Sequence, residues 1–371
     1  MAGPGVVGMA MGDHGALDGA NRVDMETARF ATKTGSSWQQ DVLRTHLGYI
    51  GGPVPIFTRI TSNMPARLFL SSGDLMADRR FEFARDLQLK GDLPAAADLL
   101  HQAIELAPSF VSAWFTLGNI REQLGERDAA IAAFRKAHVA DPDDRHGARL
   151  RLMRLGAAPL AAMTQGYVQA LFDQYARRFE STLVDDLGYR GPELLFRAVL
   201  SVRAAARKPA FFKRAIDLGC GTGLAATAFA REVDHFVGVD LSPRMIERAR
   251  LTGFYAELEV ADMVQGLRSR LEASADLILA ADAMVYVADL SPALSEASRV
   301  LAAGGLLAFT TETHAGEGVI IGAGLRYAHA AAYVRAAVEA AGLKLSLLED
   351  RSARNEDNVP VPGLVTVASK T

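Results

Sequence analysis

The most constraining feature of the chain is the stretch 215–241, where two apolar runs flank a glycine-rich turn. The first run ends in Asp217-Leu218-Gly219-Cys220-Gly221-Thr222-Gly223, and the second, at 236–239, ends in Asp240. This order predicts a strand, a tight turn, a helix, a second strand and an acid. Such a unit is typical of one half of a doubly wound α/β fold.

The residue types in this turn suit a ligand with an anionic group and a ribose. Glycines let the backbone turn tightly and approach a ligand without an intervening Cβ, and the next helix offers unpaired N–H groups to an anion. Asp240, at the end of the second strand, can accept hydrogen bonds from ribose hydroxyls. The dinucleotide fingerprint requires a further glycine at position 224, where this chain has Leu224. A strand–turn–helix without a ligand is the alternative interpretation.

From residue 211 onward, strand-like and helix-like patterns alternate, as in a parallel sheet with right-handed crossovers. We expect strands near 213–219, 235–240, 257–262, 275–281 and 305–312, and helices near 223–232, 243–252, 264–273 and 290–302. After a helix at 329–341, the apolar runs 343–349 and 363–369 leave no room for another crossover helix and should pair antiparallel. The predicted fold is therefore an α/β, Rossmann-like sheet of seven strands with an antiparallel last strand.

Residues 77–142 contain an internal repeat with a period of 34 residues. Aligning Pro108 with Pro142 brings small or apolar residues together: Gly91 with Gly125, Ala96 with Ala130, Leu100 with Phe134, and Ala103 with Ala137. With Trp114 and Leu117-Gly118, the second copy resembles the tetratricopeptide repeat (TPR), a pair of closely packed helices. Two copies are fewer than usually fold alone, so we expect 145–155 to cap the stack and the array to lean on its neighbour.

These patterns divide the chain into four expected regions. Residues 1–75 show scattered turn signals without periodicity, and we expect them to be mostly disordered or an extension wrongly assigned ahead of a start at Met76. Residues 76–158 form the all-α TPR region, 159–210 the linking helices, and 211–371 the α/β domain. In the linking region, a helix at about 164–187 has one apolar face, and a second helix runs to about residue 202. Both are expected to cover a cofactor.

Composition excludes several classes of function. A net charge of −3 with dispersed basic residues gives no reason to expect nucleic acid or an anionic membrane as a partner. The single cysteine, Cys220, excludes an internal disulfide and a cysteine-cluster metal site, and no metal is predicted. Its place in the turn needs only a small side chain, so we do not interpret it as a nucleophile. Without a bilayer-spanning run or a secretory signal, the expected location is the cytoplasm.

With these pieces assembled, residues 77–371 resemble the TPR-containing predicted methyltransferases of the class I S-adenosylmethionine (SAM)-dependent superfamily. The resemblance rests on these motifs: DLGCGTG at 217–223, ADAMVYVADL at 281–290, FDQYA at 172–176 followed by Phe179-Glu180, LGY at 187–189 with Pro192, RYAH at 326–329 with Tyr333, and VPG at 361–363. Glu180 departs from the aspartate expected there. The resemblance implies the class I methyltransferase fold and SAM as cofactor, and it supplies no substrate.

The resemblance also implies roles for cofactor-binding residues. Asp262 would receive the adenine amino group and the Met263 amide would meet the ring; capping of the following helix is the alternative role for Asp262. Arg178 would reach the methionine carboxylate or the substrate, whereas Tyr175 is equally suited to core packing. The predicted cofactor-binding set is Asp217, Gly219, Cys220, Gly221, Gly223, Asp240, Leu241, Asp262, Met263, Ala281, Tyr175 and Arg178.

Methyl transfer needs alignment of the acceptor more than covalent help, and it needs a base only if the acceptor keeps its proton near neutral pH. The candidate catalytic residues are Asp282, Tyr286, His314 and His329. Asp282 also suits a structural or substrate-orienting role. His314 follows the fifth strand, where an exposed loop histidine is equally expected. His329 is predicted to open a helix, where it either caps that helix or contacts substrate.

Three functions remain open at this point. The leading hypothesis is SAM-dependent methylation of a small molecule at oxygen, nitrogen or carbon. The second is methylation of a protein recruited through the TPR, although two repeats present little concave face and favour a stabilising or oligomerising role. The third is a non-catalytic SAM-binding adaptor, against which the intact glycines, Asp240 and Asp262 argue.

Overall fold

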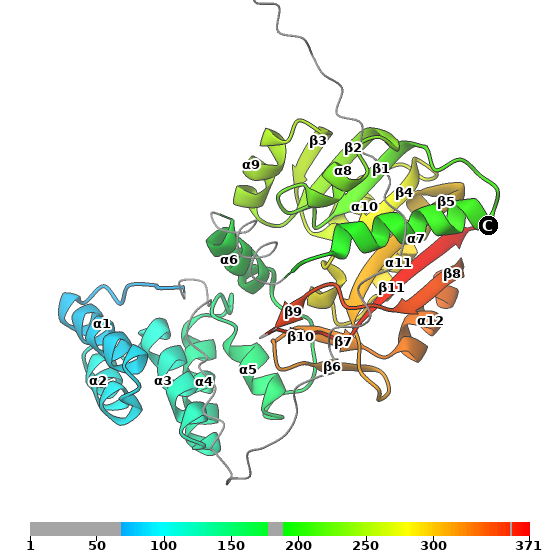
Figure 1. Cartoon of the computed structure of the whole chain (residues 1–371). Helices are drawn as coiled ribbons and strands as arrows, with labels where there is room; N and C mark the ends of the chain where they lie inside the picture. Colours follow the sequence, from blue (N-terminus) through cyan, green and yellow to red (C-terminus); the bar gives the residue numbers. More distant parts are fainter. Residues whose placement is uncertain (1–67, 177–187, 357) are drawn as a thin grey trace, which may run out of the picture. The chain divides into compact units, whose positions relative to one another are not determined.

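The computed structural model describes residues 68–176, 188–356 and 358–371, all within one compact unit, Arg59–Thr371. A helical region comes first in the chain and an α/β domain follows (Figure 1). The expectations for residues 1–67 and 177–187, which include the role of Arg178, lie outside the described residues. No helix in the described ranges is long and apolar enough to cross a membrane.

The repeat with the 34-residue period forms two helical pairs and one further helix: α1 Leu75–Leu89, α2 Leu93–Leu106, α3 Val111–Gln123, α4 Arg127–Ala140 and α5 Ala148–Arg154. The aligned alanines have no exposed surface, so the helices of each pair approach closely. A Cβ added at Gly118 would lie 2.6 Å from a ring carbon of Phe134, so this pair of positions needs glycine opposite the aromatic ring. Pro108 and Pro142 follow the ends of α2 and α4, as the sequence predicts.

Two linking helices precede the sheet, α6 Gln165–Tyr175 and α7 Gly191–Ala205. The Thr164 side chain caps α6 by accepting a hydrogen bond from the Tyr167 amide. None of the α6 residues is fully buried, because its predicted apolar face lines a cavity rather than a core. Helix α7 buries Leu195 and Val199 against the sheet.

The α/β domain contains a nine-stranded sheet, in which seven strands follow the order β3-β2-β1-β4-β5-β11-β8. These strands are β1 Phe212–Leu218, β2 Val233–Asp240, β3 Tyr255–Val260, β4 Ala275–Ala280, β5 Leu301–Glu312, β8 Leu343–Asp350 and β11 Gly363–Lys370. Strands β1 to β5 pair in parallel, and β11 pairs antiparallel with both β5 and β8. The predicted seven-strand path with an antiparallel last strand is confirmed.

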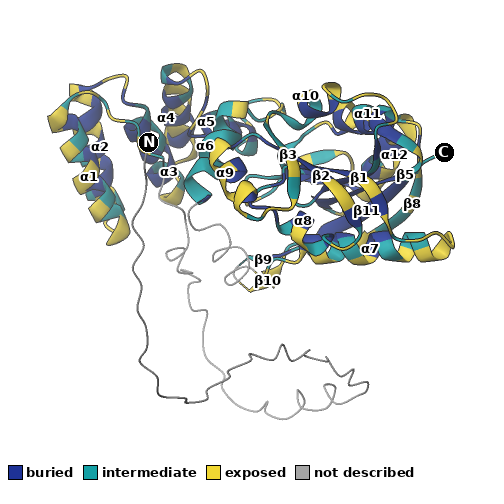
Figure 2. Cartoon of the chain, turned by 90° about the horizontal axis from the view of Figure 1, so that it is seen from above, coloured by how far each residue is buried: buried dark blue, intermediate teal, exposed yellow. Residues whose placement is uncertain are grey.

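Helices cover both faces of the sheet: α8 Leu224–Ala228, α9 Pro243–Leu251, α10 Met263–Arg268, α11 Ser291–Val300 and α12 Ala331–Ala340, with a short 3-10 helix η2 at Met284–Tyr286. Helices α7 and α8 pack on one face and α10 to α12 on the other (Figure 1). Figure 2 shows buried positions along the middle of the sheet and exposed positions along the outer side of α7. Helix α8 is shorter than the predicted 223–232, because Phe229 turns into the core and the chain enters β2.

Two hairpins were absent from the sequence prediction. One joins β6 Val319–Ile321 to β7 Tyr327–His329, and the other joins β9 Asn355–Glu356 to β10 Val359–Pro360. The prediction that His329 opens a helix is wrong, because it is the last residue of β7 and α12 begins at Ala331. Strands of two or three residues are too short to show an alternating pattern in sequence.

Candidate active site

The candidate site lies at the carboxyl edge of the parallel strands, where α/β folds bind ligands. In the strand order, β1 and β4 are neighbours, and the chain leaves them toward opposite sides of the sheet. The glycine turn follows β1, Asp240 ends β2, Asp262 follows β3, Asp282 follows β4 and Glu312 ends β5. The topology therefore brings these side chains to one edge.

The glycine turn after β1 is held against the end of β2. The amides of Gly219 and Cys220 both donate to the Val239 carbonyl, at 2.8 and 3.0 Å. Gly219 has a φ of +66°, and a Cβ there would lie 2.6 Å from the Cβ of Ala283. The turn therefore needs glycine for both conformation and space, as a cradle for a ligand does. Burial raises the pKa of the Cys220 thiol, so it remains protonated at neutral pH and unsuited to nucleophilic attack.

Asp217 is a buried acid with one carboxylate oxygen that has no hydrogen-bond partner. Its Oδ2 accepts a hydrogen bond from the Tyr255 hydroxyl at 2.6 Å, while Oδ1 is buried without a partner. Burial raises the pKa of this carboxyl to about 7. Since a buried polar oxygen without a partner is costly, this atom is suited to a ligand donor.

Asp240 joins the glycine turn to the start of α9. Its Oδ2 accepts from the Gly221 amide at 2.9 Å, and its Oδ1 accepts from the Ser242 amide at 2.8 Å. Burial raises the pKa of Asp240, while these two amides oppose that shift. Each carboxylate oxygen has a second lone pair, so the side chain can still accept from two hydroxyls of a ribose.

Asp262, which follows β3, has the capping role that the sequence offered as the alternative. Its Oδ1 accepts a hydrogen bond from the Val264 amide at 2.9 Å and so caps α10. Asp262 and Met263 also line the main cavity. Capping uses one carboxylate oxygen, so it is compatible with an adenine contact through the other.

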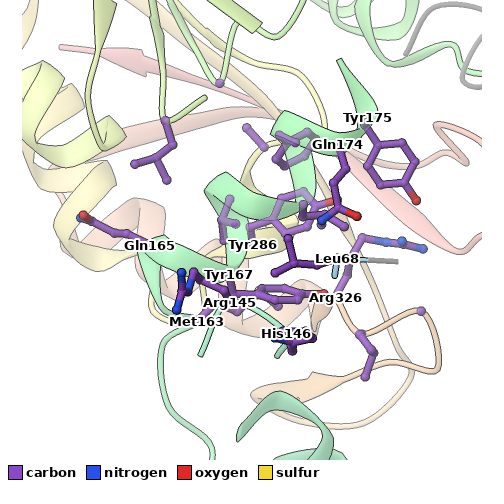
Figure 3. A pocket seen from close by; sticks show the side chains of 18 of the residues that line it. Leu68, Arg145, His146, Met163, Gln165, Tyr167, Gln174, Tyr175, Tyr286 and Arg326 are labelled. Carbon is purple, nitrogen blue, oxygen red and sulfur yellow. The ribbon is translucent and has the colours of Figure 1, made fainter. Parts of the chain in front are cut away.

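A cavity of about 430 Å³ opens at this edge. The predicted cofactor residues that line it are Gly219, Gly221, Asp240, Leu241, Asp262, Met263, Ala281 and Tyr175. Asp217 and Cys220 line a smaller cavity of about 30 Å³, which also includes Gly219, Gly221 and Ala281. Gly223 lines neither cavity and caps α8 at a φ of +96°. Figure 3 shows Tyr175 and Gln174 of α6 at the larger cavity, together with Tyr286 and Arg326.

The structure separates the four catalytic candidates into two pairs. Asp282 and Tyr286 line the cavity, whereas His314 and His329 do not. His314 is half-buried, and its Nδ1 accepts from the Gly316 amide at 3.1 Å. His329 is buried, with Nε2 2.9 Å from the Val287 carbonyl, and burial lowers its pKa to about 4. Neither histidine reaches the cavity.

Sequence reasoning missed four charged residues beside Asp282: Glu312, Arg326, Arg354 and Glu356. Together with Asp282, these residues are called the charge network below. Arg354, 4% exposed, forms ion pairs with Asp282, Glu312 and Glu356. Arg326 donates from Nε to Glu312 at 2.5 Å and also pairs with Glu356. The two arginines come from the hairpin regions, so only the RYAH motif offered a signal, and it gave Arg326 no role.

Tyr189, just before α7, was also missed as a site residue. It lines both cavities, and burial raises the pKa of its hydroxyl well above the usual value, with Asp282 adding to the shift. Asp282 itself has a φ of +57°, which is uncommon for a residue other than glycine. Backbone strain of this kind is concentrated at functional sites in proteins.

Comparison with known proteins agrees with this geometry. Residues 216–309 match the family model described as a methyltransferase domain, and residues 87–152 match a tetratricopeptide-repeat model. A ubiquinone biosynthesis O-methyltransferase from Xylella fastidiosa is 29% identical over 152 residues, which are 40% of this chain and 61% of that protein. The enzyme of the same name from Alkalilimnicola ehrlichii is 31% identical over 102 residues, 27% of this chain and 41% of that protein. The chain thus spans less than two thirds of these relatives.

Solved structures with a similar fold include a SAM-dependent methyltransferase from Mesorhizobium loti, with a TM-score of 0.35, 22% identity, and coverage of 46% of this chain and 96% of that one. Another is the 1,6-didemethyltoxoflavin-N1-methyltransferase of Burkholderia thailandensis, with a TM-score of 0.41, 17% identity, and coverage of 58% and 92%. Residues 216–309 of the chain thus match a methyltransferase domain, and the matched tetratricopeptide repeats precede it.

Proposed function

We propose that this chain transfers a methyl group from SAM to a small organic acceptor. The main observation in support is that a single cavity is lined by Gly219, Asp240 and Asp262 at one end and by Asp282 and Tyr286 at the other. The first group suits a nucleoside-type cofactor, and the second lies one strand further along the sheet, beside β4. The relatives described as ubiquinone biosynthesis O-methyltransferases support a small-molecule acceptor.

The residues present fit SAM. The unpartnered Oδ1 of Asp217 suits an ammonium donor, the glycine turn leaves no Cβ in the approach, and Asp240 keeps lone pairs for a ribose. We propose Asp262 and Met263 as the adenine contacts, because they follow β3 and line the cavity. When bound, SAM supplies a methyl group on a sulfonium, which is electrophilic without help from the protein.

The chain's own contribution would then be alignment and exclusion of water. Helix α6 lines the cavity with Phe172 and Tyr175, and its Asp173 accepts a hydrogen bond from Ser242 Oγ at 2.5 Å. This bond ties α6 to the turn that also holds Asp240. We propose that Asp282, at the acceptor end, orients the acceptor or holds its proton, and its pairing with Arg354 favours the orienting role.

A protein acceptor recruited through the repeats is less well supported. A segment of the chain itself contacts α3, where the Leu70 amide and carbonyl both bond to Ser112 Oγ, at 2.9 and 3.1 Å. Phe69 packs beside Phe81 and Phe110. A face that binds a segment in cis has less room for a partner peptide, which favours a stabilising role for the repeats.

The test is incubation of the full chain with methyl-labelled SAM and, separately, the small-molecule and protein fractions of a cell extract. We expect label in the small-molecule fraction, and less of it with an Asp240→Ala variant at the same SAM concentration. Label in proteins would favour recruitment through the repeats. SAM binding without label in either fraction would favour an adaptor.

A further inference from the structure

The charge network contains more carboxylate oxygens than its two arginines pair with. Three carboxylates face two guanidiniums, so the group carries a net charge of −1 when all are ionised. Each carboxylate uses a single oxygen in these pairs: Oδ2 of Asp282, Oε1 of Glu312 and Oε1 of Glu356. Among the described residues, the second oxygens of Asp282 and Glu356 have no hydrogen bond, and both side chains line the cavity.

The guanidiniums are largely occupied. Arg354 directs Nε, Nη1 and Nη2 at Glu356, Asp282 and Glu312, and Arg326 directs Nε and Nη2 at Glu312 and Glu356. An anionic acceptor would therefore have to break these pairs to gain a bidentate contact. A cationic group instead meets carboxylate oxygens that are already open.

Aromatic rings surround the same end of the cavity. Phe172, Tyr175, Tyr189 and Tyr286 line it, and the rings of Phe172 and Tyr286 stand edge to face with centroids 5.1 Å apart. The charges of Asp282 and Arg354 act on the hydroxyls of both Tyr189 and Tyr286, so these rings lie close to the charge network. Aromatic faces attract cations through their quadrupole, which adds to the effect of the carboxylates.

A second, independent observation indicates that the cavity takes a polar ligand. Asn119 of α3 lines it and is 4% exposed, yet neither Oδ1 nor Nδ2 of its amide has a hydrogen-bond partner. A buried amide without partners is destabilising unless a ligand satisfies it. Of the arginines that line the helical end, Arg145 pairs with Asp141 and Arg151 with Glu122, whereas Arg85 forms no ion pair with a described residue. The carboxylate oxygens without a hydrogen bond lie at the sheet end, in Asp282 and Glu356.

We propose that the acceptor cavity takes a small organic amine, whose protonated amino group binds at the carboxylates of Asp282 and Glu356. The inference rests on the proposed function and specifies its substrate class. Two open carboxylate oxygens, paired guanidiniums and aromatic walls all favour a cation over an anion at this end.

The test is calorimetric titration of the full chain, saturated with S-adenosylhomocysteine so that no turnover occurs, with three probes that share one ring. These are tyramine, 4-ethylphenol, which lacks the amino group, and 4-hydroxyphenylacetate, which carries a carboxylate instead. We expect tyramine to bind about tenfold more tightly than 4-ethylphenol, since one charge-assisted pair contributes about that much. We expect 4-hydroxyphenylacetate to bind most weakly.

Variants assign the preference to named residues. Glu356→Gln and Asp282→Asn should each weaken tyramine about fivefold or more and leave 4-ethylphenol unchanged. Glu356 is 39% exposed at its side chain, so its variant should fold even if Asp282→Asn, which leaves Arg354 less paired, does not. The control is Glu349→Gln, which removes a carboxylate from an exposed pair with Arg351 outside the cavity.

The inference is overturned if tyramine binds no more tightly than 4-ethylphenol, or if 4-hydroxyphenylacetate binds most tightly. It is also overturned if Glu356→Gln weakens the binding of tyramine and of 4-ethylphenol equally. Binding of S-adenosylhomocysteine is recorded first, so its absence counts against the proposed function instead. The probe titrations are repeated without that cofactor product, which keeps the two failures separate.

Discussion

Asp217 combines complete burial with an open oxygen, and its charge state is therefore sensitive to pH. Burial raises its pKa in the folded protein from 3.8 to about 7. Between these values the folded chain holds a proton that the unfolded chain has released, so the free energy of unfolding falls as pH rises. Above pH 7 both states are ionised and this contribution stays constant.

Asp217→Asn should remove this dependence. Relative to the variant, the wild type should lose of order 2–4 kcal/mol of unfolding free energy between pH 4 and pH 7, at about 1.4 kcal/mol per pKa unit. Urea unfolding of both proteins at pH 4.5, 6 and 8 measures the difference. A difference that is equal at all three values would show that Asp217 is not shifted.

Asp240→Ala should weaken SAM by about 1–3 kcal/mol, because ribose hydroxyls would lose their acceptor. The variant also frees the Gly221 and Ser242 amides, so its thermal unfolding is measured alongside the titration. The control is Asp234→Ala, an exposed acid on the same strand. SAM affinity equal to that of the wild type would remove Asp240 from the cofactor site.

Asn119→Leu should stabilise the fold, although it changes a residue that lines the cavity. The side chains are similar in size, and the change removes a buried amide whose lack of partners costs about 1–3 kcal/mol. We expect a rise in the midpoint of thermal unfolding, with Asn119→Asp, which buries a charge, as the destabilised counterpart. A lower midpoint for the leucine variant would mean that protein groups satisfy the amide in solution.

At the scale of elements, the glycine turn and the chain after β4 fit together through Gly219 and Ala283. Gly219→Ala should disrupt SAM binding and lower stability, since its Cβ would lie 2.6 Å from that of Ala283 at a φ of +66°. Gly253→Ala is the matched control, because it has a φ of +72° and nothing within 4 Å of a new Cβ. Unfolding and SAM titration of both variants separate the backbone cost, about 1 kcal/mol, from the clash. Equal behaviour of the two would contradict this packing.

The elements that sequence predicts well are those whose periodicity reflects local burial. Strands β1, β2 and β4 appear as apolar runs because both their faces are covered, and the repeat appears because small residues recur where helices meet. Hairpins β6–β7 and β9–β10 carry no such pattern, because strands of two or three residues are too short to alternate, and β7 is in addition positioned by its pairing with β5. At the site, the glycine turn and the acids that follow the strands could be predicted because they belong to a local sequence motif.

The charge network shows what a motif leaves out. Arg354 and Asp282 are separated by 72 residues, and their pairing depends on how the β9–β10 hairpin meets the carboxyl edge. Nothing in the local sequence of Arg354 indicates that it is buried beside three carboxylates. For His329 the sequence predicted a contact that the structure does not show. A histidine near a helix start was a candidate for substrate contact, but it is buried against the Val287 carbonyl.

At the scale of the whole molecule, the repeats and the α/β domain contribute to one cavity, which Asn119 of α3 and Asp282 both line. This arrangement gives the helical region a part in acceptor binding, in addition to its own stability. Tyr327 of β7 donates a hydrogen bond to the Ala161 carbonyl, which links the region after α5 to the sheet. The cavity therefore depends on the helical region as well as on the sheet.

If the carboxyl edge of this sheet binds SAM, calorimetric titration of the full chain with SAM will show it, with NAD as the control ligand. We expect micromolar SAM binding and no NAD binding, because the turn has Leu224 where a dinucleotide site needs glycine. A folded protein that binds NAD, or that binds neither ligand, would contradict this expectation.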